Sequence, residues 1–122
     1  MNVQGFAPQF RTTDLNRAID FYTEKLNFTV SFRYEDFYAG VENGGHQIHL
    51  KLIGDPDPGI EFVREGKHLH FYLTVDDIQS AFADLKKAGV KIVENISQRP
   101  WGMSEFVIED PDGHTIYIAH SS

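Results

Sequence analysis

Two histidines and a tyrosine, His49, His70 and Tyr117, are the residues of this chain whose types and positions could do chemistry. Each lies in a short segment where polar or aromatic residues alternate with apolar ones, as in a β-strand. Imidazoles can ligate a divalent metal, and an imidazole can act as a general base near neutral pH. The same side chains can also line a polar cleft and hydrogen-bond to an organic ligand without a metal.

An internal repeat relates these residues to one another. The hexamer GHQIHL, which contains His49, returns near the end of the chain as GHTIYI, in which Tyr117 takes the place of that histidine. The segment that starts at Ala7 aligns in the same way with the segment that starts at His70. The repeat therefore predicts that Ala7, His49, His70 and Tyr117 converge around one pseudo-twofold axis, where a metal or a small ligand could bind.

Both halves of the chain predict the same order of elements. Apolar residues recur with helical spacing over 15–26 and 78–85, each helix is preceded by one strand-like segment, and three more follow it. Glycine and proline residues supply the hairpin turns and mark a linker at 54–67. The expected fold is α+β: a single domain over 1–122, with βαβββ modules at approximately 1–53 and 68–122 whose curled mixed sheets surround a cleft.

Capping residues bound the expected helices. Asp14 or Thr13 is a suitable N-cap for the first helix, and Asp76 with Gln79 forms a suitable capping box for the second. Both helices are expected to end at residue types that tolerate a left-handed backbone, Asn27 and Gly89.

The strand alternation predicts one polar face on each sheet. The apolar side chains should lie under the helices, and the polar set should line a concave, partly wet surface. This polar set supplies the predicted ligand-binding residues Gln47, His49, His70, Tyr72 and Tyr117.

The loop RPWGMSE supplies one further candidate, Trp101. Its indole can stack on a flat ligand group or cap the hydrophobic core, and the sequence leaves both readings open. Nearby, Arg99 and Glu105 could frame the cleft, but we expect them to be solvated charges.

Composition limits the classes of partner. The 122 residues carry a net charge of −7 with His neutral, which disfavours binding to nucleic acid or to anionic membranes and tolerates a cationic ligand. The absence of cysteine excludes disulfides and thiolate chemistry. No apolar run is long enough to span a bilayer, and the first residues do not open a signal peptide, so we expect a cytoplasmic protein.

Four segments of the sequence carry a family resemblance: TTDLNRAIDFYTEKLNF, LTVDDIQSAFADLKKAGV, PWGMSEF and EDPDGHTIYI. Together they span most of the chain, and it resembles the vicinal-oxygen-chelate superfamily of glyoxalases, bleomycin resistance proteins and extradiol dioxygenases. The resemblance implies paired βαβββ modules and a homodimer whose clefts lie between subunits.

The same resemblance implies where a metal would bind. Metal enzymes of this superfamily take His, Gln and Glu ligands from the four positions that are Ala7, His49, His70 and Tyr117 in this chain. Alanine has no donor atom and tyrosine is a neutral phenol, so the donor set is poor for a divalent ion. No metal and no other cofactor is therefore expected.

The resemblance is nearest to the bleomycin-resistance branch, which sequesters a drug without that metal site. We expect metal-independent binding of a small organic ligand, cationic or aromatic, by a drug-sequestering protein of the antibiotic-resistance type rather than by an enzyme. One alternative is a metal-dependent lyase or isomerase, or a dioxygenase-type enzyme, with a divalent metal at His49 and His70. Another is a partner protein without a small ligand.

Overall fold

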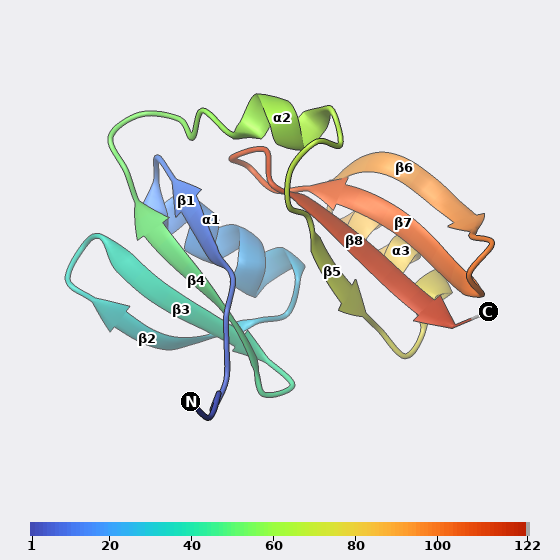
Figure 1. Ribbon diagram of the computed structural model, residues 1–122, viewed down its shortest axis with the longest axis horizontal. Coiled ribbons are helices and arrows are strands. Elements are labelled where there is room, and N and C mark those ends of the chain that lie inside the picture. The colour runs from blue at the N-terminus through green and yellow to red at the C-terminus, as the bar shows by residue number, and fades with distance from the viewer. Residues whose placement is uncertain (122) are drawn as a thin grey trace. The chain divides into compact units, whose positions relative to one another are not determined.

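The computed structural model describes residues 1–121 and divides into two compact units, Met1–Pro58 and Gly59–Ser122. Each unit contains one open four-stranded mixed sheet and the element order βαβββ (Figure 1). The expected α+β class is confirmed. The boundary between the units falls inside the segment 54–67 that was expected to be a linker.

In the first unit the sheet order is β1-β4-β3-β2, with β1 parallel to β4 and the other pairs antiparallel. The helix continues directly into a π-helical turn, which is labelled η1. The elements are β1 Gln9–Thr12, α1 Leu15–Asp20, η1 Phe21–Lys25, β2 Thr29–Tyr34, β3 Tyr38–Asn43 and β4 His46–Leu52.

The second unit repeats this topology with the order β5-β8-β7-β6, in which β5 is parallel to β8. It begins with a short helix that buries Ile60 and Val63. The elements are α2 Ile60–Arg64, β5 Phe71–Thr74, α3 Ile78–Lys87, β6 Lys91–Gln98, β7 Met103–Glu109 and β8 Thr115–Ser121.

One helix covers one face of each sheet (Figure 1). In the first unit α1 contacts β3 and β4, and in the second α3 contacts β6, β7 and β8. Burial of this apolar face supplies most of the favourable free energy of folding. Along each strand, the side chains that alternate with the buried apolar ones point to the face without a helix. The buried apolar residues include Leu15, Ala18, Tyr22, Val41, Ile48 and Leu50 in the first unit and Ile78, Leu85, Phe106, Ile108, Ile116 and Ile118 in the second.

Aspartates at equivalent places of the repeat begin the two main helices. The carboxylate of Asp14 accepts a hydrogen bond from the backbone N–H of Arg17, and that of Asp77 accepts one from Ser80, each at 3.0 Å. The predicted cap at Asp14 is confirmed. The predicted capping box of Asp76 with Gln79 is wrong, because α3 starts one residue later and Asp77 is its N-cap.

The chain turns out of each helix through a left-handed residue, as expected. Asn27 has φ 60° and Gly89 has φ 79°. The hairpin between β3 and β4 uses Gly44 and Gly45, both with positive φ, which suits the twist of a two-residue turn.

Gly40 on β3 leaves room for a side chain of the neighbouring strand. A Cβ atom at this position would lie 2.2 Å from Cε1 of Phe32, whose ring lies over the glycine from the neighbouring edge strand β2. The missing side chain therefore makes room for the Phe32 ring on the helix-free face of the sheet. In the part of the chain that the structure describes, no helix has the length and apolar character needed to cross a membrane.

The capping assignment predicts unequal effects of two adjacent substitutions. Asp77→Ala should lower the free energy of unfolding by about 1 kcal/mol, because Ser80 N–H loses its acceptor. Asp76→Ala should change it by less than about 0.5 kcal/mol, as expected at an exposed surface position. Urea unfolding followed by circular dichroism measures both changes. A loss in Asp76→Ala as large as that in Asp77→Ala would contradict the assignment of Asp77 as the N-cap.

The close approach at Gly40 predicts a local repacking. Gly40→Ala should displace the Phe32 ring and cost about 1–3 kcal/mol of unfolding free energy, the usual range for overpacking. Gly54→Ala is the matched control, because a Cβ there meets no atom within 4 Å. Methyl and ring proton shifts in NMR spectra report the movement of Phe32, and an unchanged Phe32 signal in the Gly40 variant would contradict the packing.

Candidate functional site

The helix-free faces of the two sheets carry the polar and aromatic side chains, and each is described within its own unit. On the first unit they form the His49 group: Gln9, Phe32, Tyr38, Gln47 and His49. On the second unit they form the Glu105 group: His70, Tyr72, Arg99, Trp101, Glu105 and Tyr117.

A chain of hydrogen bonds runs through the His49 group. Gln9 donates from Nε2 to the Tyr38 hydroxyl at 3.0 Å, and that hydroxyl lies 2.9 Å from His49 Nδ1. His49 Nε2 lies 3.2 Å from the side-chain oxygen of Gln47, which can only accept. Nε2 therefore carries the proton, and Nδ1 accepts from Tyr38.

Both ring nitrogens of His49 therefore take part in hydrogen bonds. Its ring also packs edge-on against Phe32, with centroids 5.2 Å apart and an interplanar angle of 89°, and against Tyr38 at 5.5 Å. Ligation of a metal by His49 would require the loss of its bond to Tyr38 or to Gln47. The imidazole is placed as a wall of the face, with its tautomer fixed by its neighbours.

A buried carboxylate organises the Glu105 group. Glu105 on β7 is 1% exposed and accepts three hydrogen bonds. The Tyr72 hydroxyl and the Trp101 indole N–H donate to Oε2 at 2.6 and 2.9 Å, and Arg99 Nε donates to Oε1 at 3.1 Å. The expectation of a solvated charge is wrong for Glu105, which is buried. Arg99 is partly exposed and donates a hydrogen bond to Glu105.

A tight turn places the donors around this carboxylate. Gly102 N–H donates to the carbonyl of Arg99 at 3.1 Å, which closes a turn over 99–102 with Pro100 in its second position. Gly102 takes φ 83°. The turn brings Arg99 and Trp101 back over the start of β7, while Tyr72 reaches Glu105 from β5.

The electrostatics of this group follow from its hydrogen bonds. Burial disfavours the charged form of Glu105, but the hydrogen bonds from Tyr72, Trp101 and Arg99 outweigh burial and hold its pKa below the ordinary value. The hydrogen bond to Glu105, burial and the negative charge of Glu105 raise the pKa of Tyr72. The hydrogen bond to Glu105 likewise raises the pKa of Arg99. Near pH 7 the group is an ionised carboxylate, a guanidinium and a neutral phenol.

His70 and Tyr117 join this group through their rings. The His70 ring lies 5.2 Å from that of Tyr117, and His70 Nδ1 is 2.5 Å from the hydroxyl of Thr115. Tyr72 and Tyr117 are paired residues of β5 and β8, and their rings stack at 6.4 Å. Tyr72 therefore connects the aromatic pair to Glu105.

The strand registers show that the two groups occupy equivalent positions of the repeat. Gln9 pairs with His49 as Tyr72 pairs with Tyr117, and Tyr38 pairs with Lys51 as Glu105 pairs with Ala119. The hydrogen bond from Gln9 to Tyr38 thus corresponds to the one from Tyr72 to Glu105. Each of these two hydrogen bonds crosses the strand that lies between its partners, β4 in the first sheet and β8 in the second, on the helix-free face.

The structure places the predicted site residues in two sets. His49 and Gln47 are hydrogen-bonded neighbours in the first unit, while His70, Tyr72, Trp101 and Tyr117 are linked in the second. Sequence reasoning missed the role of Glu105 as a buried acceptor. Alternation along MSEFVIE, with Phe106 and Ile108 on the core side, could have put Glu105 on the polar face, but no local pattern predicts that three donors from other segments bury it.

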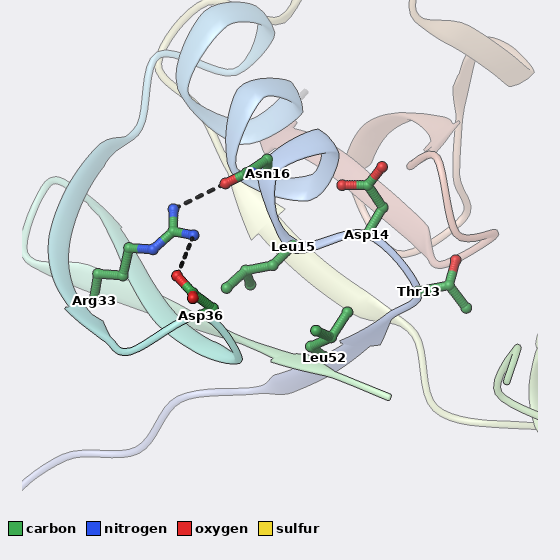
Figure 2. Close-up of a pocket in the computed structure, with 7 residues that line it drawn as sticks. All are labelled: Thr13, Asp14, Leu15, Asn16, Arg33, Asp36 and Leu52. Atoms are coloured by element: carbon green, nitrogen blue, oxygen red, sulfur yellow. Dashed lines mark hydrogen bonds and ion pairs between the residues drawn. The ribbon is translucent and has the colours of Figure 1, made fainter. Parts of the chain in front are cut away.

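A separate shallow pocket of about 280 Å³ lies in the first unit near the start of α1 (Figure 2). It contains none of the predicted site residues. Two of its three charged side chains, Arg33 and Asp36, are exposed, with 3.8 Å between Nη2 of Arg33 and Oδ1 of Asp36. Such an exposed ion pair contributes little to the free energy of folding. Its lining residues are Thr13, Asp14, Leu15, Asn16, Arg33, Asp36 and Leu52. Among residues 1–121 there is no group of three or more His, Cys, Asp or Glu side chains that could hold a metal ion.

The buried carboxylate predicts a pH-dependent stability. Because the folded protein lowers the pKa of Glu105, its contribution is fully present above about pH 4.5 and is lost as the pH falls through the lowered pKa. Glu105→Gln should therefore cost about 2–3 kcal/mol at neutral pH, and the gap to the wild type should close in acid. Urea unfolding over a pH series measures it. Glu94→Gln, at a half-exposed carboxylate, is the control, and a gap that stays constant down to about pH 3 would contradict the assignment.

Solved structures share the fold of this chain. The bleomycin resistance determinant encoded on transposon Tn5 matches with a TM-score of 0.78 and 19% identity, covering 98% of this chain and 99% of that one. The bleomycin-binding protein of Streptomyces verticillus, solved with copper(II)-bleomycin, matches with a TM-score of 0.74 and 18% identity, covering 100% and 99%. At these identities the likeness concerns the fold.

Sequence comparison identifies the family. The protein YwbC of Bacillus subtilis (strain 168) is 32% identical over 111 residues, which cover 84% of this chain and 86% of YwbC. The family model of the Glyoxalase/Bleomycin resistance protein/Dioxygenase superfamily matches residues 6–118. The resemblance noted from the sequence motifs is confirmed, and this chain belongs to the glyoxalase/bleomycin resistance protein/dioxygenase superfamily.

Proposed function

We propose that this chain binds a small or medium-sized organic ligand, without a metal, on the helix-free faces of its sheets. The observation that carries the proposal is the hydrogen bonding of these faces. The His49 imidazole and the Tyr38 phenol satisfy one another, as do the Glu105 carboxylate, the Tyr72 phenol and the Trp101 indole, while large aromatic surfaces stay exposed. Mostly apolar walls with a few fixed polar groups are typical of ligand sites.

The donor set at the four equivalent positions does not fit a divalent metal. Ala7 has no donor atom, both nitrogens of His49 are hydrogen-bonded, and Tyr117 supplies a neutral phenol. The buried carboxylate, Glu105, already accepts from three donors. A divalent ion needs three or four N or O donors with some negative charge, so we derive no metal-dependent step.

Family membership and charge support a ligand of the drug type. The structurally similar protein of Streptomyces verticillus was solved with copper(II)-bleomycin, and the Tn5 protein is a bleomycin resistance determinant. A net charge of −7 favours a cationic ligand over nucleic acid or an anionic membrane. We therefore propose a drug-sequestering protein of the antibiotic-resistance type that acts as a cytoplasmic homodimer.

Each group of the proposed site has a defined role in this reading. Tyr72, Trp101 and Tyr117 offer ring surfaces on which a flat ligand group can stack. Gln47 and His70 offer polar edges that fix the orientation of the ligand, and the ring of His49 forms a wall beside Gln47. Binding then excludes water from the faces and requires no bond-making step.

The test is calorimetric titration of the protein with metal-free bleomycin, with and without a chelator. Binding should persist in the chelator, and Tyr72→Ala should weaken it about tenfold if the phenol ring is an energetic anchor. Phe62→Ala is the matched control, because Phe62 is a similarly exposed aromatic on α2, outside the Glu105 group.

Two outcomes would overturn the proposal. Binding that disappears in the chelator, together with stoichiometric zinc or manganese held by the protein in the absence of bleomycin, would favour the metal-dependent enzyme. A protein that binds no organic probe under any of these conditions would favour the reading as a partner protein.

A further inference from the structure

Glu105 is too deeply buried to meet a ligand directly. Its Oε2 accepts from both Tyr72 and Trp101, its Oε1 accepts from Arg99, and only 1% of the residue is exposed. A carboxylate at the centre of a binding face is an obvious candidate to pair with a cationic ligand. Here the geometry assigns that charge a different task.

The two rings that Glu105 holds are its outward-facing neighbours. Trp101 is 65% exposed and Tyr72 is 46% exposed, although the polar atom of each is fixed on one carboxylate oxygen. Glu105 therefore anchors both rings by their polar edges and leaves much of each ring surface open to solvent. Without this acceptor, an exposed indole on a loop would sample several rotamers.

The same hydrogen bonds change the electronic character of the rings. The face of an aromatic ring carries the negative part of its quadrupole, which attracts cations. Hydrogen bonds to an ionised group polarise their donors, so a carboxylate that accepts from the indole N–H and the phenol O–H shifts electron density into both rings. Both rings thus become better surfaces for a positive charge than free tryptophan or tyrosine.

The surrounding charges support this direction. The guanidinium of Arg99 is held between Glu105 at 3.1 Å and Glu94 at 3.2 Å, so two carboxylates offset its positive charge. The side chain of Arg99 is 22% exposed. The positive charge of Arg99 is thus balanced beside the rings and does not oppose a cation there.

We propose that Tyr72 and Trp101 form a cation-binding platform for a positively charged aromatic group, and that Glu105 is the positioning residue that sets its orientation and strength. This inference rests on the proposed ligand-binding function and names the chemical class of the ligand. It assigns selectivity for charge to a residue that does not touch the ligand.

The test compares two probes of the same shape, N-methylquinolinium and quinoline, at a mildly alkaline pH where quinoline is uncharged. Calorimetry or NMR titration of the wild type gives the ratio of the two affinities, which we expect to favour the cation by about tenfold, within the usual range for a desolvated cation–π contact. Trp101 is the only tryptophan, so its indole N–H signal identifies the binding site directly.

Three variants separate positioning from simple loss of charge. Glu105→Gln should bring the affinity ratio close to one while quinoline still binds, and Tyr72→Phe, which keeps the ring and removes the donor, should lower the ratio about two- to fivefold. Glu94→Gln removes the same formal charge. Glu94 also pairs with Arg99, but it accepts no hydrogen bond from Tyr72 or Trp101 in the contacts described above. The Glu94→Gln variant should leave the ratio within about twofold of the wild type.

The outcomes divide cleanly. An unchanged ratio in folded Glu105→Gln and Tyr72→Phe, or an equal loss in Glu94→Gln, overturns the platform. A wild type that binds both probes equally also overturns it, while leaving ligand binding itself intact. If neither probe binds the wild type, the platform falls, and the titration with metal-free bleomycin decides the proposed function separately.

Discussion

Burial of one face of each four-stranded sheet under a single helix is the constraint from which the other features follow. In a strand that alternates, apolar side chains committed to the helix force every second residue onto the opposite face. Ile48 and Leu50 under α1 send Gln47 and His49 outward, and Ile116 and Ile118 send Tyr117 outward. The site residues on the strands are thus placed by the core, whereas Arg99 and Trp101 are placed by the turn before β7.

The polar groups on the two helix-free faces find their hydrogen-bond partners in two different ways. In the first unit, neutral donors and acceptors satisfy one another in a line from Gln9 to Gln47. In the second, a single ionised carboxylate collects its donors from β5 and from the turn before β7. A buried charge is tolerated only when such donors surround it, which makes Glu105 the residue whose loss would disturb the most neighbours.

Periodicity, the internal repeat and the turn residues predicted the two repeated modules but not the short helix α2 inside the segment expected to be a linker. They gave the βαβββ order, the cap at Asp14 and the left-handed exits at Asn27 and Gly89, because these features depend on neighbours close in sequence. The shift from Asp76 to Asp77 shows the limit of a motif read without the helix start. The repeat itself carried the correct answer, since Asp77 is the equivalent of Asp14.

The candidate site could be predicted only in part. Alternation predicts the outward residues His49, His70 and Tyr117. It does not predict the burial of Glu105, because that burial depends on Tyr72, which lies 33 positions away in the chain. The equivalence of the Gln9–Tyr38 and Tyr72–Glu105 links has a consequence for divergence. The repeat preserves the location of the link and not its chemistry, so each pair is free to change only as a unit. Co-variation between positions 72 and 105, and independently between 9 and 38, is the mark that this coupling should leave among relatives.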